Sequence, residues 1–167
     1  MSATDRANVF EPRFDEGQPG GPRRARLGWQ AGTERIGVSL YELPPGDRRW
    51  PYHYQHGNEE MLIVLTGRPH LRTPAGWRRL DRGDVVAFPR GERGAHKVEN
   101  RTDDEVRYLM LSEMNAPDVM VYPDSGKVGV ISRPPGSRGD EDALAAWFRL
   151  DDQVDYWEGE SGAEESG

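Results

Sequence analysis

The stretch from Gly46 to Gly67, GDRRWPYHYQHGNEEMLIVLTG, decides the fold of this chain and holds two of its four histidines. Side chains alternate between the two faces of a strand, so His53 and Gln55 share one face. Tyr52, Tyr54 and His56 lie on the opposite face. Imidazole and amide groups that meet a carboxylate on one face of a sheet predict a set of metal ligands.

An apolar run follows this cluster directly and predicts the next strand. The residues MLIVL at 61–65 are too few for a helix and rich in side chains that favour strands. In that strand Glu60 shares a face with Leu62 and Val64, whereas Glu59 lies on the other face. If the two strands pair, Glu60 joins the ligand set, and Glu59 faces solvent or a neighbouring arginine.

The composition indicates one domain of short strands and turns. A chain of 167 residues can bury a core, and its 20 glycines and 13 prolines do not suit a helical bundle. The formal net charge of -7 disfavours a nucleic-acid partner, although much of it follows Asp140. The absence of cysteine excludes disulfides, thiolate metal ligands and cysteine nucleophiles. No segment has the pattern of a signal peptide or a membrane span, so we expect a cytoplasmic protein without a membrane partner.

Four regions are expected along the chain. Residues 1–26 are polar and rich in Pro, Gly and Arg, which predicts a flexible or extended arm. Residues 27–115 show strand patterns separated by turns, beginning with LGWQ, and predict an all-β barrel. Residues 116–158 are expected to pack on the barrel or on a second subunit, and residues 159–167 to form a disordered acidic tail.

The C-terminal extension is expected to be partly helical or irregular. The segments DVMVYPD and KVGVIS are candidate edge strands. The segment DALAAWFRL, at 142–150, predicts a short helix with Asp140 or Asp142 as its cap. Beyond it, Tyr156 and Trp157 are an aromatic pair expected to pack against the barrel or another subunit.

Two motifs within the predicted barrel resemble those of the cupin superfamily. The first cupin motif is Gly, five residues, His-x-His, three or four residues, Glu, six residues and Gly. In this chain Glu60, the six residues after it and Gly67 fit the motif, and His53 stands where the first histidine belongs. The interval from Gly46 to His53 is one residue too long, and Gln55 replaces the second histidine.

The second cupin motif is Gly, five residues, Pro-x-Gly, two residues, His, three residues and Asn. This chain has Gly83, five residues, Pro89-Arg90-Gly91, four residues, His96, three residues and Asn100. The two motifs stand in the cupin order, and the resemblance covers roughly residues 35–112. It implies the double-stranded β-helix, or jelly-roll barrel, of that superfamily.

The resemblance also implies a mononuclear metal site. Its ligands carry over as His53, Gln55, Glu60 and His96, and its metal as a divalent Fe, Mn, Ni or Zn ion. An amide oxygen is a poorer donor than imidazole for late metals, so Gln55 is either a weak fourth ligand or a partner of bound water. Two histidines and one carboxylate still match the facial triad of non-haem iron sites. His56 could replace the missing histidine only through a bulge after Gln55, and otherwise faces solvent or a partner sheet.

The sequence defines the surroundings of the metal site less closely than it defines the ligands. The candidate residues of a substrate pocket are Tyr54, His56 and Phe88. No catalytic residue is assigned, because Glu60 would be a ligand and a general base would have to be a tyrosine or glutamate at the barrel mouth.

The sequence is compatible with three functions. The first is an enzyme of dioxygenase or isomerase type that acts on a small oxygen-rich molecule at the metal. The second is a non-catalytic binding or sensing cupin with a degenerate metal site. The third is a metal-free sugar-nucleotide epimerase with His53 or His96 as base and a tyrosine as acid. By resemblance to other small cupins we also expect a homodimer.

Overall fold

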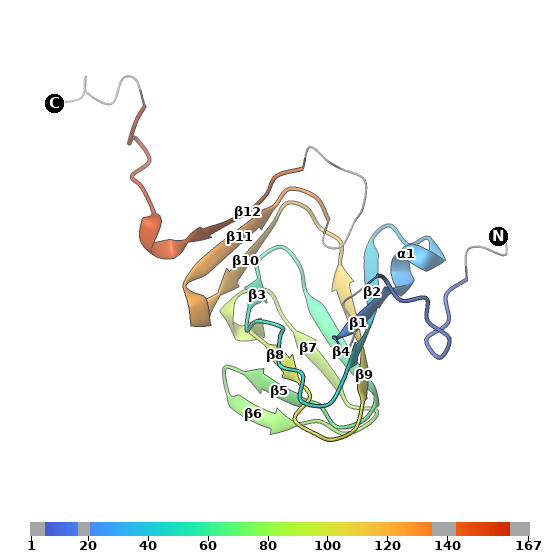
Figure 1. Ribbon diagram of the computed structural model, residues 1–167. Helices are drawn as coiled ribbons and strands as arrows, with labels where there is room; N and C mark the ends of the chain where they lie inside the picture. Colours follow the sequence, from blue (N-terminus) through green and yellow to red (C-terminus); the bar gives the residue numbers. More distant parts are fainter. Residues whose placement is uncertain (1–5, 17–20, 135–142, 161–167) are drawn as a thin grey trace.

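The protein is built from short antiparallel strands (Figure 1). This computed structural model describes residues 6–16, 21–134 and 143–160. The strands within them are β1 Arg23–Arg26, β2 Ile36–Leu43, β3 Tyr54–Gln55, β4 Glu60–Thr66, β5 His70–Thr73, β6 Gly76–Arg79, β7 Val85–Phe88, β8 Lys97–Glu99, β9 Val106–Glu113, β10 Asp118–Tyr122, β11 Lys127–Ile131 and β12 Ala145–Arg149. The helical segments are α1 Leu27–Ala31 and the 3-10 turns η1 Glu92–Gly94, η2 Pro123–Ser125 and η3 Leu150–Asp152. The prediction of an all-β fold is confirmed.

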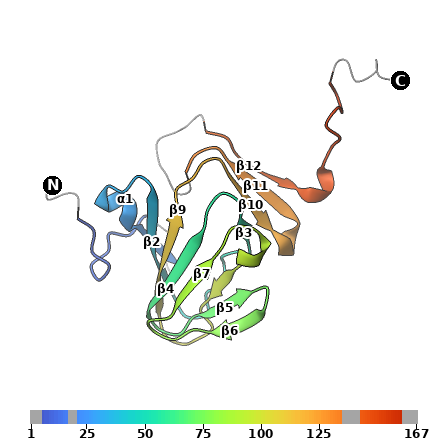
Figure 2. The same cartoon turned by 180° about the vertical axis from the view of Figure 1, so that it is seen from behind.

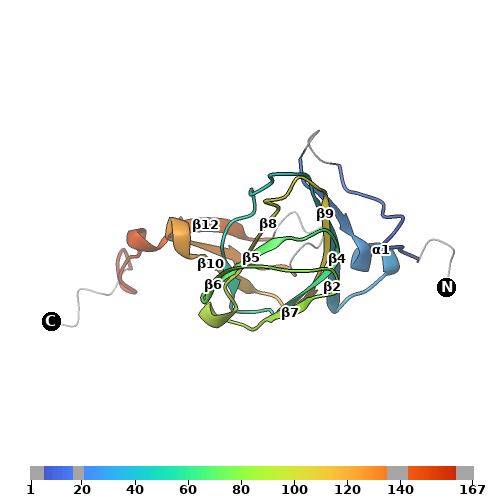
Figure 3. The ribbon, with the colours of Figure 1, turned by 90° about the horizontal axis from the view of Figure 1, so that it is seen from below.

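Two sheets enclose the core, and a third sheet extends from them. The larger sheet has the order β1-β2-β9-β4-β7, and the smaller one across the core has the order β6-β5-β8. Figure 3 shows the two sheets from below. The third sheet, β12-β11-β10-β3, has its β10–β12 part on the opposite side of the molecule from α1, as Figures 1 and 2 show.

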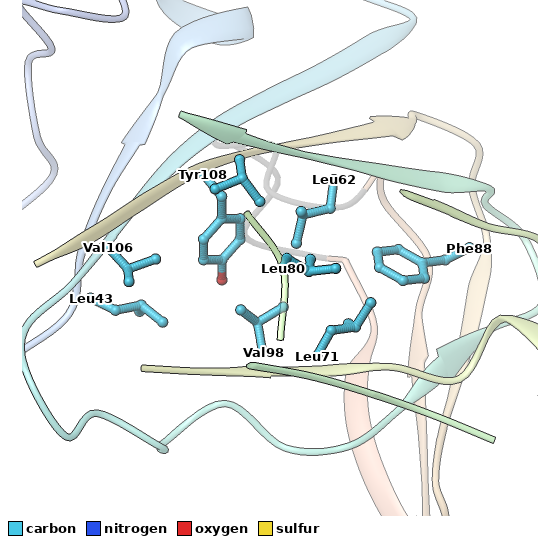
Figure 4. Close-up of a cluster of buried hydrophobic side chains, with 9 residues drawn as sticks. Leu43, Leu62, Leu71, Leu80, Phe88, Val98, Val106 and Tyr108 are labelled. Atoms are coloured by element: carbon cyan, nitrogen blue, oxygen red, sulfur yellow. The ribbon is translucent and has the colours of Figure 1, made fainter. Parts of the chain in front are cut away.

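The core is formed by alternate residues of the strands that face one another across the barrel. Leu62 and Val64 of β4 point inward with Glu60, as the alternation predicts. Figure 4 shows this cluster, whose buried members are Leu43, Leu62, Val64, Leu71, Leu80, Phe88, Val98, Val106 and Tyr108. Each large apolar side chain buried here contributes about 1.5–3 kcal/mol to folding. The cluster fills one end of the barrel and so fixes the strands that carry the polar residues at the other end.

The last glycine of the first motif is required for a steric reason. Gly67 has a φ of 74°, and a Cβ atom there would lie 2.7 Å from the carbonyl oxygen of Glu105. A side chain at this position would therefore push the turn after β4 away from the start of β9. This close approach explains why the motif requires glycine here.

The N-terminal segment covers part of the outer face of the larger sheet. Ala25, Leu27 and Leu40 are buried there, with Val9 and Phe14 packed against them. The prediction of a strand at LGWQ is wrong, because these residues form α1, which ends at Gly32 in a left-handed conformation with φ 79°. The short helix turns Leu27 back onto the sheet, where burial outweighs any strand preference. No helix of the described residues is long and apolar enough to cross a membrane.

The C-terminal extension is a sheet in the structure. The segments predicted as edge strands form β10 and β11, which confirms them as strands, but the predicted edge position is wrong because both lie between β12 and β3. The prediction of a helix in DALAAWFRL is wrong, because Ala145–Arg149 form β12 and pair with β11 along its whole length. Pairing with β11, which lies outside the segment, overrides its weak local preference for helix. The two proposed caps, Asp140 and Asp142, lie outside the described residues.

Candidate metal centre

An isolated antiparallel bridge brings the two motif histidines together. The backbone of His53 donates to His96 at 3.1 Å, and the backbone of His96 donates to His53 at 2.9 Å. Because the two residues face each other across this bridge, their side chains emerge on the same side. The ring centroids lie 4.8 Å apart.

Glu60 approaches the same point from β4. Its Oε2 atom lies 3.5 Å from Nε2 of His96. One ligand atom from each of His53, Glu60 and His96 lies within 4.8 Å of the others. Two imidazoles and one carboxylate at this spacing form the 2-His-1-carboxylate arrangement that suits a divalent first-row metal.

Hydrogen bonds and stacking orient both imidazole rings. Nδ1 of His53 lies 3.2 Å from the carbonyl oxygen of Pro51, and Nδ1 of His96 lies 3.0 Å from that of Gly94. A proton on each Nδ1 serves these carbonyls and leaves the Nε2 lone pair for a metal. Phe88 stacks on His96 with ring centroids 3.9 Å apart and an interplanar angle of 12°.

Burial shifts the protonation of all three groups. Burial lowers the pKa of His53, and burial together with the nearby His53 lowers the pKa of His96 to about 3. Burial raises the pKa of Glu60 to about 7, and a hydrogen bond from Gln55 moderates this rise. The imidazoles are therefore neutral at neutral pH, which is the form that coordinates metals.

The hydrogen bonding of Gln55 indicates whether these residues fit a metal ion. Its amide donates to the carboxylate of Glu60, while its own Oε1 is buried and has no hydrogen-bond partner. A buried acceptor without a partner costs about 1–3 kcal/mol. A metal ion, or a water bound to it, would satisfy this oxygen, so the donor set fits a divalent cation.

The other predicted pocket residues lie away from the cluster. His56 is exposed and packs edge-to-face against Tyr54, with ring centroids 5.4 Å apart. No bulge carries His56 to the site, and neither it nor Tyr54 lines the cavity around the ligand cluster. Phe88 is buried in the core behind His96 and supports that ring.

A cavity of about 420 Å³ opens beside the ligand cluster. Sequence reasoning missed most of its wall, which includes Tyr41, Tyr108, Met110, Met120, Tyr122 and Trp147. Alternation along β2 and β9 could have identified Tyr41, Tyr108 and Met110 as inward-facing residues. Nothing in the sequence pattern links the C-terminal residues to the cavity.

The asparagine of the second motif has a structural role. Asn100 is fully buried, and its amide donates to the carbonyls of Leu43, Pro44 and Asp104. Its Oδ1 accepts from the backbone of Thr102. The side chain therefore holds the turn after β8 and lies outside the ligand cluster.

The fold and the ligand cluster define a class of protein. The strands enclose an apolar core at one end of the barrel. At the other end they bring two histidines and a glutamate together, which is the arrangement that the two motifs imply. The family model described as "Cupin domain" matches residues 39–112. Residues 39–112 of the chain therefore form a cupin domain.

Solved structures show the same fold over most of the chain. A sugar phosphate isomerase of the cupin superfamily from Silicibacter pomeroyi is 24% identical, with a TM-score of 0.73 over 88% of this chain and 94% of that one. A protein from Acidithiobacillus ferrooxidans, provisionally given the same isomerase name, is 24% identical, with a TM-score of 0.70 over 86% and 88%.

A more distant structure shares a smaller part of the fold. The polyketide cyclase RemF from Streptomyces resistomycificus is 22% identical, with a TM-score of 0.54 over 65% of this chain and 78% of that one. No curated protein sequence matches the chain. Similarity at these identities shows the fold alone.

Proposed function

We propose that the barrel holds one divalent metal ion at His53, Glu60 and His96, with Gln55 beside it. The protein then acts on a small molecule that binds there through its oxygen atoms. The observation that carries the proposal is the convergence of one ligand atom from each residue within 4.8 Å, beside a cavity of about 420 Å³.

The chemistry follows from the arrangement of the side chains. A metal bound here supplies Lewis-acid polarisation for isomerase-type chemistry or oxygen activation for dioxygenase-type chemistry. Pro51 and Gly94 hold the two imidazoles by their Nδ1 atoms, and Gln55 holds the carboxylate of Glu60. The neighbours named as isomerases and as a cyclase share the fold, so the ligand cluster is the main support for this proposal.

Metal reconstitution tests the proposal directly. Metal-free protein is incubated with Fe, Mn, Ni or Zn, and the metal retained per chain is measured after desalting. We expect one equivalent in the wild type, and a loss in the His96→Ala and Glu60→Gln variants. The His56→Ala variant is the matched control, because this exposed histidine lies outside the cluster. A wild-type protein that retains none of these metals would refute the proposal.

Reaction type is then decided with the metal that binds. Oxygen consumption in the presence of a substrate indicates dioxygenase chemistry, whereas conversion without oxygen consumption indicates isomerase chemistry. Activity that survives in metal-free protein would instead favour a metal-independent reaction at the histidines.

We also infer that the protein pairs with a second copy of itself. Large apolar side chains are exposed along the C-terminal segment, namely Leu144, Phe148, Leu150, Val154, Tyr156 and Trp157. Exposed apolar groups at this density are typical of a protein–protein contact. The outer edge of β12 has no partner strand among the described residues, which offers a place for pairing.

A further inference from the structure

We propose that the cavity beside the ligand cluster takes a planar, largely apolar molecule, and that Trp147 is the surface on which this molecule stacks. The inference rests on the proposed metal site as the point where the oxygen atoms of the molecule attach. It narrows the substrate to a flat carbon frame, such as an aromatic ring system, with adjacent oxygen atoms at one edge.

A glycine on the neighbouring strand leaves the space that the indole of Trp147 occupies. Trp147 of β12 pairs with Gly129 of β11, and Gly129 is followed across the sheet by Met120 and then Gln55. A Cβ atom at Gly129 would lie 2.6 Å from Nε1 and 2.9 Å from Cδ1 of Trp147. The indole therefore lies directly over Gly129, in space that no other residue type would leave free.

A hydrogen bond and a stacked ring connect this indole to the ligand cluster. Nε1 of Trp147 donates to the hydroxyl of Tyr122 at 3.3 Å. The ring of Tyr122 is stacked with that of His53, with centroids 5.8 Å apart and an interplanar angle of 20°. Trp147 nevertheless remains 51% exposed while it lines the cavity. It presents an aromatic surface to the same cavity that the ligand cluster lines.

The remaining wall of the cavity is also aromatic and apolar. Tyr41 is stacked on Tyr108 with centroids 5.2 Å apart, and Trp50 meets Tyr41 edge-on at 5.4 Å. Thioether side chains fill much of the rest, from Met110, Met114 and Met120. Aromatic faces and methionine sulfur favour flat apolar ligands over heavily hydroxylated ones.

Each cationic group at the cavity already contacts a carboxylate, which it shares with a second cation outside the cavity wall. Among its lining residues, Arg24 lies 3.4 Å from Asp15, and Lys97 lies 2.9 Å from Glu99. A phosphate group entering the cavity would have to compete with these carboxylates. This competition, together with the aromatic and methionine wall, favours a flat apolar molecule over a sugar phosphate, although two neighbours in fold are named for that substrate.

Ligand titration by calorimetry tests the inference. The probes are a dihydroxynaphthalene with adjacent hydroxyl groups, naphthol as the frame with a single hydroxyl group, and glucose 6-phosphate. In metal-loaded protein we expect the dihydroxynaphthalene to bind most tightly. The Trp147→Ala and Gly129→Ala variants should each bind it about tenfold more weakly, because the stacking surface is lost or displaced.

Matched variants distinguish the loss of stacking from a general loss of structure. Trp147→Phe should retain most of the affinity, because a phenyl ring still offers a flat face. Trp157→Ala should bind like the wild type, since this exposed tryptophan does not line the cavity. Metal content should be unchanged in all of these variants.

Two results would overturn the inference. One is a Trp147→Ala variant that binds the dihydroxynaphthalene like the wild type, and the other is tighter binding of glucose 6-phosphate by the wild type. Naphthol binding to metal-free protein separates this inference from the proposed function. If no metal binds but naphthol affinity still depends on Trp147, the metal site is refuted and the stacking surface stands. If metal binds but the affinity for the probes does not depend on Trp147, the stacking surface is refuted and the metal site stands.

Discussion

Gln55 donates a hydrogen bond to Glu60 within the ligand cluster, and its own Oε1 is left buried without a partner. The amide thus holds the carboxylate with its nitrogen and offers an oxygen to the cluster. These two contributions of one side chain can be separated by substitution.

Replacing Gln55 tests both contributions. The Gln55→His variant adds an imidazole at the position where the cupin motif has its second histidine, so we expect Ni and Zn affinity to rise about tenfold. The Gln55→Leu variant removes the amide at similar volume and should weaken all metals about tenfold, because Glu60 loses its support. Affinities are measured by competition with a chelator. Equal affinities in the three proteins would show that Gln55 contributes nothing to the site.

The turn before His96 should also control metal affinity. Gly94 accepts the Nδ1 hydrogen bond of His96, and a Cβ atom at Gly94 would lie 1.7 Å from the carbonyl oxygen of Pro89. The Gly94→Ala variant must therefore move η1 and rotate His96. We expect a loss of about tenfold in metal affinity and of about 1–3 kcal/mol in the free energy of unfolding.

The control for this variant is Glu92→Ala, which changes an exposed residue of the same turn. It should bind metal like the wild type. An unchanged metal affinity in Gly94→Ala would mean that the turn does not set the orientation of the imidazole.

Neighbouring positions on β4 should differ strongly in their effect on stability. Leu62 is 0% exposed and points into the core, whereas Met61 is 37% exposed on the outer face. We expect Leu62→Ala to lower the free energy of unfolding by about 2–5 kcal/mol. Met61→Ala should cost about 1 kcal/mol or less. Urea denaturation measures both, and similar losses would contradict the inward direction of Leu62.

Glu99 should make stability sensitive to acid. Burial raises the pKa of Glu99, but hydrogen bonds from Lys97 and Arg101 outweigh it, and the pKa lies below the ordinary value of 4.5. Because the folded pKa is lowered, this stabilisation is present above pH 4.5 and is lost as the pH falls through the folded pKa.

The Glu99→Gln variant tests this contribution. At pH 7 it should be less stable than the wild type by about 1–2 kcal/mol. Below the folded pKa of Glu99 the difference should shrink, because the wild-type carboxyl is then neutral as well. Unfolding curves at both pH values give the comparison, and a difference independent of pH would exclude the ion pairs as its source.

The exposed C-terminal segment should determine the oligomeric state. We expect the full chain to have twice the mass of a single chain in light scattering, and a variant that lacks residues 150–167 to be mainly monomeric. The deletion leaves β12 and Trp147 in place. A full-length monomer would refute the proposed homodimer, and an unchanged dimer after deletion would place its interface elsewhere.

The sequence predicts the ligand cluster better than it predicts the cavity. His53, Glu60 and His96 follow from motif spacing, because alternation along strands and one backbone bridge are enough to bring them together. For Trp147 the sequence predicts a helix, because the residues around it have no strand alternation that would reveal β12. Its position depends on the register of β12 on β11 and of β10 on β3, which only the folded chain establishes.

β3 has only 2 residues, and its strand partner is β10. Residues 39–112, which match the cupin family, do not include β10. A shortened protein that ends with the matched segment would therefore leave the backbone beside Gln55 with an open edge. Attempts to isolate the ligand-bearing unit, or to graft it onto another scaffold, would have to carry the chain at least through Tyr122.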